Sequence, residues 1–241
     1  MNKYLNLFNY FNWIKRLIKV NSKKYKNSNS FIKINSQNIN SSDKLIDFHF
    51  KTYSDKNHIN FEMFKLLLKY FSEKSLNILE TGSVAHGSSS TILFIYYIKI
   101  FGGSLNTVDI NPDIRNKYKH LITKDIQFHT NDSLKFIESL TSEEIKKIDL
   151  IYLDSFDLDV LDPEPSQEHG LNEFLLLNNN IKKGALIAID DTPKDVNLFG
   201  DKFENIHNFI PGKGRLVLNY IDKHGGYEII YHHYAVILKK I

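Results

Sequence analysis

Apolar residues in this chain fall into short runs separated by segments with helical spacing, and the pattern is clearest from Asn77 onward. Five runs have the length and composition of buried strands: residues 77–80, 105–108, 126–129, 148–153 and 185–189. Helices are predicted around them at residues 61–71, 92–101, 112–122, 134–140 and 171–177. Strands that alternate with helices in this way favour an α/β fold with a doubly wound, mostly parallel sheet.

The end of the chain has a different pattern. Residues 216–221 and 227–238 are rich in apolar and aromatic residues and flank Gly225-Gly226, which predicts an antiparallel hairpin. Together with the parallel strands, this hairpin predicts a seven-stranded sheet. Residues 155–168, rich in Asp, Pro and Glu, are predicted to form an irregular loop at the mouth of a site.

Charge divides the chain into two parts. Eight of its 31 basic residues and none of its 28 acidic residues precede Asp43. We therefore predict a basic N-terminal arm, residues 1–42, and one α/β domain, residues 43–241, which the length of 241 residues allows. An acidic body with a basic arm is not typical of a nucleic-acid-binding protein, so no nucleic-acid partner is expected. The absence of cysteine excludes disulfides and Cys-based metal sites, and it fits a cytoplasmic protein.

The arm contains one amphipathic segment. Residues 4–19 place Leu7, Phe8, Phe11, Ile14 and Ile18 at helical spacing. We expect this helix to dock on the domain or on a partner subunit, which is compatible with a homo-oligomer. The alternative is a peripheral membrane contact, because basic residues occupy the other face. Residues 21–42 are expected to form a linker, and neither a spanning segment nor a secretory signal is predicted.

A loop of small residues follows the first strand. Gly82 and Gly87 bracket it, and residues 88–90 are serines suited to capping the next helix. Asp109 ends the second strand, where a carboxylate can accept both hydroxyls of a ribose. The pattern predicts a nucleoside-binding β-α-β unit, with Asp132 of the third strand near the base. The predicted cofactor-binding residues are Glu80, Gly82, Gly87, Ser88, Asp109 and Asp132.

Carboxylates end the later strands too. Asp154 follows the fourth strand, and Asp190 and Asp191 follow the fifth. Because the carboxyl ends of parallel strands share one edge of the sheet, these three are expected to converge. Oxygen ligands without cysteine suit Mg²⁺, Mn²⁺ or Ca²⁺ better than zinc. The alternative for Asp190 and Asp191 is a helix cap and a solvated turn.

These residues carry a family resemblance over about residues 77–191. The segments ILETGSVAHGSSS, LNTVDINPD, IYLDS and GALIAIDD resemble motifs of class I S-adenosylmethionine-dependent methyltransferases. Within this class, the chain resembles in particular the metal-dependent small-molecule O-methyltransferases typified by the catechol and macrocin sugar enzymes. It implies a Rossmann-like fold and S-adenosylmethionine as cofactor, with Asp109 on the ribose. It also implies a divalent metal, Mg²⁺ first, on Asp154, Asp190 and Asp191.

The general base departs from the family pattern. The catechol enzymes have a lysine three residues after the first metal aspartate, and this chain has Asp157 there. We therefore expect a base elsewhere, His169 first and Asp157 second, and a small-molecule or saccharide hydroxyl as the acceptor. A surface or capping role is the alternative for His169.

Several alternatives stay open from the sequence. The same fold could serve a cephalosporin-hydroxylase-like enzyme, a non-catalytic cofactor-binding scaffold subunit or a nicotinamide-dependent dehydrogenase. The basic loop Pro211-Gly212-Lys213-Gly214-Arg215 is expected to be a solvated turn, with steering of an anionic substrate as the alternative. His49, Tyr53 and His58 are expected at the surface, with the rim of a pocket as their alternative.

Overall fold

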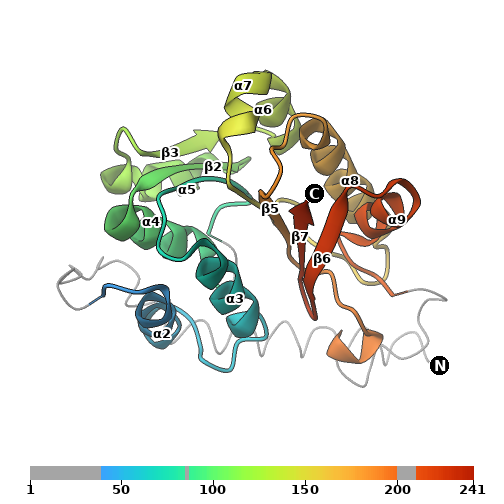
Figure 1. The fold of residues 1–241 in the computed structure, drawn as a ribbon, viewed down its shortest axis with the longest axis horizontal. Helices are drawn as coiled ribbons and strands as arrows, with labels where there is room; N and C mark the ends of the chain where they lie inside the picture. The colour runs from blue at the N-terminus through green and yellow to red at the C-terminus, as the bar shows by residue number, and fades with distance from the viewer. Residues whose placement is uncertain (1–38, 85–86, 200–209) are drawn as a thin grey trace.

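Five parallel strands form the centre of the protein, and an antiparallel hairpin extends one edge. The computed structural model describes residues 39–84, 87–199 and 210–241, and a seven-stranded sheet in the order β3-β2-β1-β4-β5-β7-β6 lies within them. The strands are β1 (Leu76–Thr81), β2 (Gly103–Asp109), β3 (Ile126–Thr130), β4 (Leu150–Leu153), β5 (Leu186–Ile189), β6 (Tyr227–His232) and β7 (Val236–Lys240). β7 runs antiparallel to β5 and to β6, whereas the other pairs are parallel, so the predicted fold class is confirmed (Figure 1).

Helices cover both faces of the sheet and produce two hydrophobic cores. The first core involves α2 (Ser42–Thr52), α3 (Phe61–Phe71) and α4 (Ser90–Phe101). The second involves α6 (Ser133–Ser139), α7 (Ser142–Lys147), α8 (Glu164–Asn178) and α9 (Arg215–His224). Figure 1 shows α3 and α4 on one side of the sheet and α8 and α9 on the other. The remaining short helices are α5 (Pro112–Lys117), η3 (Lys119–Leu121) and η4 (Val196–Phe199).

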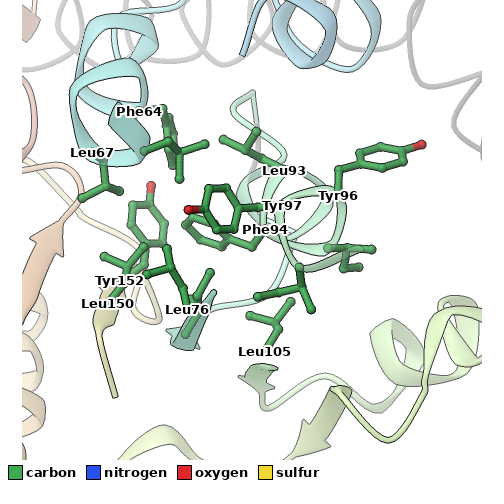
Figure 2. Packing of buried hydrophobic residues seen from close by; sticks show 14 of the residues in the cluster. Phe64, Leu67, Leu76, Leu93, Phe94, Tyr96, Tyr97, Leu105, Leu150 and Tyr152 are labelled. Atoms are coloured by element: carbon green, nitrogen blue, oxygen red, sulfur yellow. The ribbon is translucent and has the colours of Figure 1, made fainter. Parts of the chain in front are cut away.

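The helix after the glycine loop is the most deeply buried one described. Residues 90–98 of α4 are all buried, as expected for a helix that is apolar on every side. Phe94 meets the ring of Tyr152 on β4 edge to face at 5.7 Å between centroids, and Phe64 of α3 contacts the same ring at 5.5 Å (Figure 2). This aromatic layer fixes α3 and α4 against the middle of the sheet.

Residues 155–168 are helical in their last part, contrary to the predicted loop. α8 begins at Glu164, after Pro163 and with Pro165 in its first turn. Proline is compatible with this position because the first N–H groups of a helix have no partner within it. The consequence is that His169 lies on a helix and has a fixed direction.

The prediction that residues 216–221 form the first strand of the hairpin is wrong. Residues 215–224 form α9, in which Val217 and Ile221 are buried four residues apart on one helical face. The hairpin consists instead of β6 and β7, on the C-terminal side of Gly225-Gly226. α7, which the apolar pattern does not predict, begins with a capping box between Thr141 and Glu144.

The predicted amphipathic helix at residues 4–19 lies outside the described residues, as does most of the predicted linker. Within the described ranges, we find no helix with the length and apolarity needed to span a membrane. The division at Asp43 stays a prediction, although α2 begins beside it, at Ser42.

Candidate functional site

β1 lies between β2 and β4 in the sheet. The chain passes from β1 outward to β2 and β3 and then returns to β4 on the other side of β1. Such a change of direction leaves a crevice at the carboxyl ends of the strands, where open α/β sheets bind ligands. Gly82 follows β1 with φ of +79°, and its α-carbon is so close to the carbonyl oxygen of Asp154 that a β-carbon would overlap it. The glycine loop and the end of β4 are therefore packed directly together.

Glu80 lies beneath this loop. Its side chain is fully buried and accepts hydrogen bonds from Ser90 Oγ at 2.6 Å and from Thr91 Oγ1 and Thr107 Oγ1 at 2.7 Å. Burial raises the pKa of Glu80 to about 7, against the effect of these hydrogen bonds. Thr91 Oγ1 also accepts the N–H of Val84, so Glu80 holds the loop. A direct contact between Glu80 and a cofactor stays a prediction.

Asp109 is at the end of β2, beside the loop. Its Oδ2 accepts the N–H of Ser83 at 3.0 Å, and its Oδ1 accepts the N–H of Asn111 at 2.8 Å. The carboxylate is half-buried and directed at the strand end, the position predicted for a ribose ligand. Asp132 is half-exposed and caps α6 by accepting the N–H of Lys135 at 3.1 Å. If Asp132 also contacted the nucleobase of a cofactor, as predicted, it would have to do so while it caps α6.

The serines after the loop do not cap α4 as predicted. Ser89 occupies the N-cap position in a left-handed conformation, without a side-chain bond to the helix. Ser88 Oγ is buried and has no hydrogen-bond partner among the described residues. The first turn of α4 therefore has no side-chain cap, which leaves room for a ligand to take that place.

Asp190 and Asp191 are two of the three predicted metal ligands, and a hydrogen bond links the backbone of Asp191 to the side chain of Asp190. Asp190 is buried, and its Oδ1 accepts Asn60 Nδ2 and the N–H of Asp191, both at 2.7 Å. Its Oδ2 accepts the hydroxyl of Tyr152 at 2.6 Å. Burial, followed by the neighbouring carboxylate of Asp191, raises the pKa of Asp190. Asp191 itself adopts φ of +42°, a strained value for a non-glycine residue.

Lys213 joins the remaining carboxylates. Its Nζ lies 2.5 Å from Asp154 Oδ1 and 3.2 Å from Asp191 Oδ2, and the residue is 4% exposed. Burial alone would lower the pKa of Lys213, but Asp154, Asp191 and Asp190 raise it above its ordinary value. The expectation of a solvated turn is therefore wrong for Lys213. A lysine between two glycines is the available sequence signal, because glycines permit close packing of the backbone.

This arrangement does not fit a divalent metal in its present form. The part of the chain that the structure describes contains no group of three or more His, Asp or Glu side chains arranged to hold a metal ion. The oxygens of Asp190 are taken by protein donors, and an ammonium lies between Asp154 and Asp191. A Mg²⁺ ion needs several free oxygen ligands at about 2.1 Å, and a neighbouring ammonium would repel it.

His169 lines a small cavity that also includes Asp154, Phe156, Gly170, Glu173 and Lys213. Its Nε2 lies 2.9 Å from Ser133 Oγ and 3.5 Å from Glu173 Oε1, and the imidazole stacks at a tilt on Phe156. The structure thus brings His169 together with Asp154. Asp157 is exposed and is not one of the cavity-lining residues.

His49, Tyr53 and His58 contact the glycine loop or α4, so the expected surface positions are wrong for this group. His49 is fully buried and donates from Nε2 to the carbonyl oxygen of Ser88 at 2.7 Å. Tyr53 and Tyr96 of α4 share a hydrogen bond of 2.6 Å between their hydroxyls. A β-carbon on Gly87 would lie 2.8 Å from His58 Nε2. The alternative, a pocket rim, is closer to what the structure shows.

No protein-family model matches the chain, and no curated protein matches it. Solved structures do match. One is the MycE methyltransferase of the mycinamycin biosynthetic pathway, in complex with Mg, S-adenosylhomocysteine and mycinamycin VI, at 15% identity and a TM-score of 0.57. A second is cofactor-bound Rv0187 from MTB, at 13% identity and a TM-score of 0.52. The chain has the fold of class I S-adenosylmethionine-dependent methyltransferases.

The match extends over 82% of this chain and 53% of MycE, so the chain spans about half the length of that relative. For Rv0187 the shares are 83% and 87%. At these identities the likeness concerns the fold, and the chemistry has to be argued from the residues.

Proposed function

We propose that this protein is an S-adenosylmethionine-dependent methyltransferase that acts on a hydroxyl group of a small molecule or saccharide. The observation that carries the proposal is the direct packing of the glycine loop against the strand end that bears Asp154. A cofactor held by the loop and Asp109 would lie beside the cavity lined by Asp154 and His169. Binding and chemistry would therefore occur in adjacent parts of one crevice.

Each part of the crevice has a separate role in this proposal. Asp109 would accept the ribose hydroxyls, and the loop between Gly82 and Gly87 would contact the methionine part through its backbone. The buried hydroxyl of Ser88, which has no partner among the described residues, supports a polar ligand there. When bound, S-adenosylmethionine supplies an electrophilic methyl group on a sulfonium.

His169 is the proposed general base. Because Nε2 is engaged by Ser133, the other ring nitrogen, Nδ1, would take the proton of the acceptor hydroxyl as that oxygen forms its bond to the methyl carbon and the carbon–sulfur bond breaks. Ser133 and Glu173 hold the imidazole in place through the contacts described above. The proton then lies on His169 and the sulfur is neutral, so charge and atoms balance.

A saccharide acceptor is supported by the polar segment that follows β4. Asp157 and Asp159 lie there, next to the residues that line the cavity, and Asp157 is exposed. Hydroxyl-rich ligands are recognised by such polar groups, whereas a phenol would favour an apolar wall. No step of the proposed reaction passes through a metal, because the carboxylates predicted to bind one are engaged by protein donors.

Two measurements on the full chain test the function. Calorimetry with S-adenosylmethionine, S-adenosylhomocysteine and NAD should show binding of the first two and weaker or absent binding of NAD. Methyl-labelled cofactor incubated with pools of sugars, nucleotide sugars and phenols should then transfer label to a hydroxyl compound. Tighter binding of NAD would favour a dehydrogenase and overturn the proposal. Cofactor binding without label transfer to any pool would favour the scaffold or hydroxylase alternatives.

A further inference from the structure

Lys213 is held in place by its own backbone and by that of the next residue. Its N–H donates to the carbonyl of Asp191 at 3.0 Å, and the next N–H, of Gly214, donates to Thr192 Oγ1 at 2.9 Å. The carbonyl of Lys213 packs so closely on Gly170 of α8 that a β-carbon there would lie 2.7 Å from the oxygen. These backbone contacts therefore fix the position of Lys213.

The charges around Lys213 explain why a buried ammonium is tolerated there. An unpaired ammonium in a protein interior is very costly, and a carboxylate without a partner is costly as well. Asp154 Oδ1 accepts a hydrogen bond from the ammonium, and Asp191 Oδ2 lies at ion-pair distance from it, while Asp190 is satisfied by Asn60 and Tyr152. Each predicted metal ligand thus has a protein partner.

We propose that Lys213 is the resident cation of this site and replaces the divalent metal ion that the sequence motifs suggest. The catalytic role of Lys213 in this inference rests on the proposed function. An ammonium group has three proton donors, and the structure shows one of them donating to Asp154, while Asp191 balances the charge at ion-pair distance. Because Lys213 lines the same cavity as His169, a further donor of its ammonium can hold the acceptor oxygen for deprotonation.

The replacement has a chemical consequence. A single positive charge that donates a hydrogen bond stabilises a developing oxyanion less than a directly coordinated Mg²⁺ ion does. The reaction therefore depends more on a base at His169 than it would with a metal. Treatment with a chelator should accordingly leave the charge balance of the site intact.

Direct measurement of metal binding tests the proposal without knowledge of the acceptor. Mn²⁺ titrated into the metal-free full chain, followed by electron paramagnetic resonance, should show no saturable site in the wild type. Lys213→Ala removes the ammonium and frees oxygens of Asp154 and Asp191, so this variant should gain one Mn²⁺ site and a Tm that rises with added Mg²⁺. Stoichiometric Mn²⁺ binding by the wild type would overturn the proposal.

A second variant covers the case in which Lys213→Ala does not fold. Lys213→Ala combined with Asp154→Asn removes one charge of each sign, so it avoids an uncompensated carboxylate. It should fold and bind Mn²⁺ weakly through Asp191 and the amide oxygen introduced at position 154. A folded Lys213→Ala, or a folded double variant, that binds no more Mn²⁺ than the wild type would count against the replacement.

Lys182→Ala is the matched control, because Lys182 Nζ also lies 2.5 Å from an aspartate, Asp149, but outside the crevice. This variant should gain no Mn²⁺ site. The assay also separates the two proposals. Failure to bind S-adenosylmethionine would overturn the proposed function and leave the Mn²⁺ results readable. Once an acceptor is found, turnover that EDTA abolishes and Mg²⁺ restores would overturn the role of Lys213 alone.

Discussion

Gly82 packs its α-carbon directly against the carbonyl oxygen of Asp154, which fixes the glycine loop to the end of β4. Gly82→Ala should destabilise the protein by about 3 kcal/mol, because a β-carbon adds overlap to the strain of a positive φ. Cofactor affinity should fall with it. Chemical denaturation and calorimetry measure the two effects.

Gly184→Ala is the control for this substitution. Gly184 has a similar φ of +83°, but nothing lies within 4 Å of the position that its β-carbon would take. It should cost only about 1 kcal/mol, the penalty of a left-handed conformation for alanine. Equal costs for the two variants would mean that Gly82 and Asp154 are not in close contact.

Asp109→Ala should weaken S-adenosylmethionine binding by about 100-fold, since charge-assisted hydrogen bonds to a ligand contribute about 1.5–3 kcal/mol each. The variant also loses the bond from Ser83 N–H that positions the loop. Asp113→Ala removes an exposed carboxylate four residues away and should leave the affinity unchanged. Isothermal calorimetry decides the matter, and equal affinities would show that Asp109 does not contact the cofactor.

His169→Gln should lower kcat by about 100-fold, the lower end of what a general base contributes, with S-adenosylmethionine affinity retained. Gln can still accept or donate at the position of Nε2 but cannot take a proton. His224→Ala, on the exposed end of α9, should have wild-type kcat. If the His169→Gln variant kept the kcat of the wild type, His169 would not be the general base.

The buried His49 should make the protein sensitive to acid. Burial lowers its pKa from 6.5 to about 4, so the folded state binds fewer protons than the unfolded state between these values. Stability is therefore full above pH 6.5 and is lost as the pH falls toward 4, by about 3 kcal/mol for such a shift. His49→Gln keeps a donor for the Ser88 carbonyl and does not titrate. Denaturation at several pH values should show a smaller acid loss in this variant than in the wild type.

The sequence predicts the sheet well because β4 and β5 are continuous apolar runs and β1, β2 and β3 carry apolar residues between turn or helix signals. The ends of these predicted strands place Asp109, Asp154 and Asp190 at the carboxyl edge of the sheet. The apolar pattern is a poorer guide where it fits both the two-residue period of a strand and the 3.6-residue period of a helix. Residues 216–221 contain enough apolar residues for a strand, yet the spacing of Val217 and Ile221 is that of a helix.

The partners of the carboxylates could not be predicted from local pattern. Asn60 bonds Asp190 across 130 positions of sequence, and Lys213 reaches Asp154 across 59. Both contacts depend on how helices and loops pack on the finished sheet. Strand ends indicate where acidic groups gather, whereas the cation among them becomes apparent only in three dimensions.

Tyr152 belongs to two environments at once. Its ring packs between Phe64 and Phe94, and its hydroxyl donates to Asp190 at 2.6 Å. Any change in the aromatic layer will therefore move a group at the crevice. Efforts to alter acceptor preference by directed evolution should leave this layer intact, because substitutions there would reduce activity more than their effect on folding suggests.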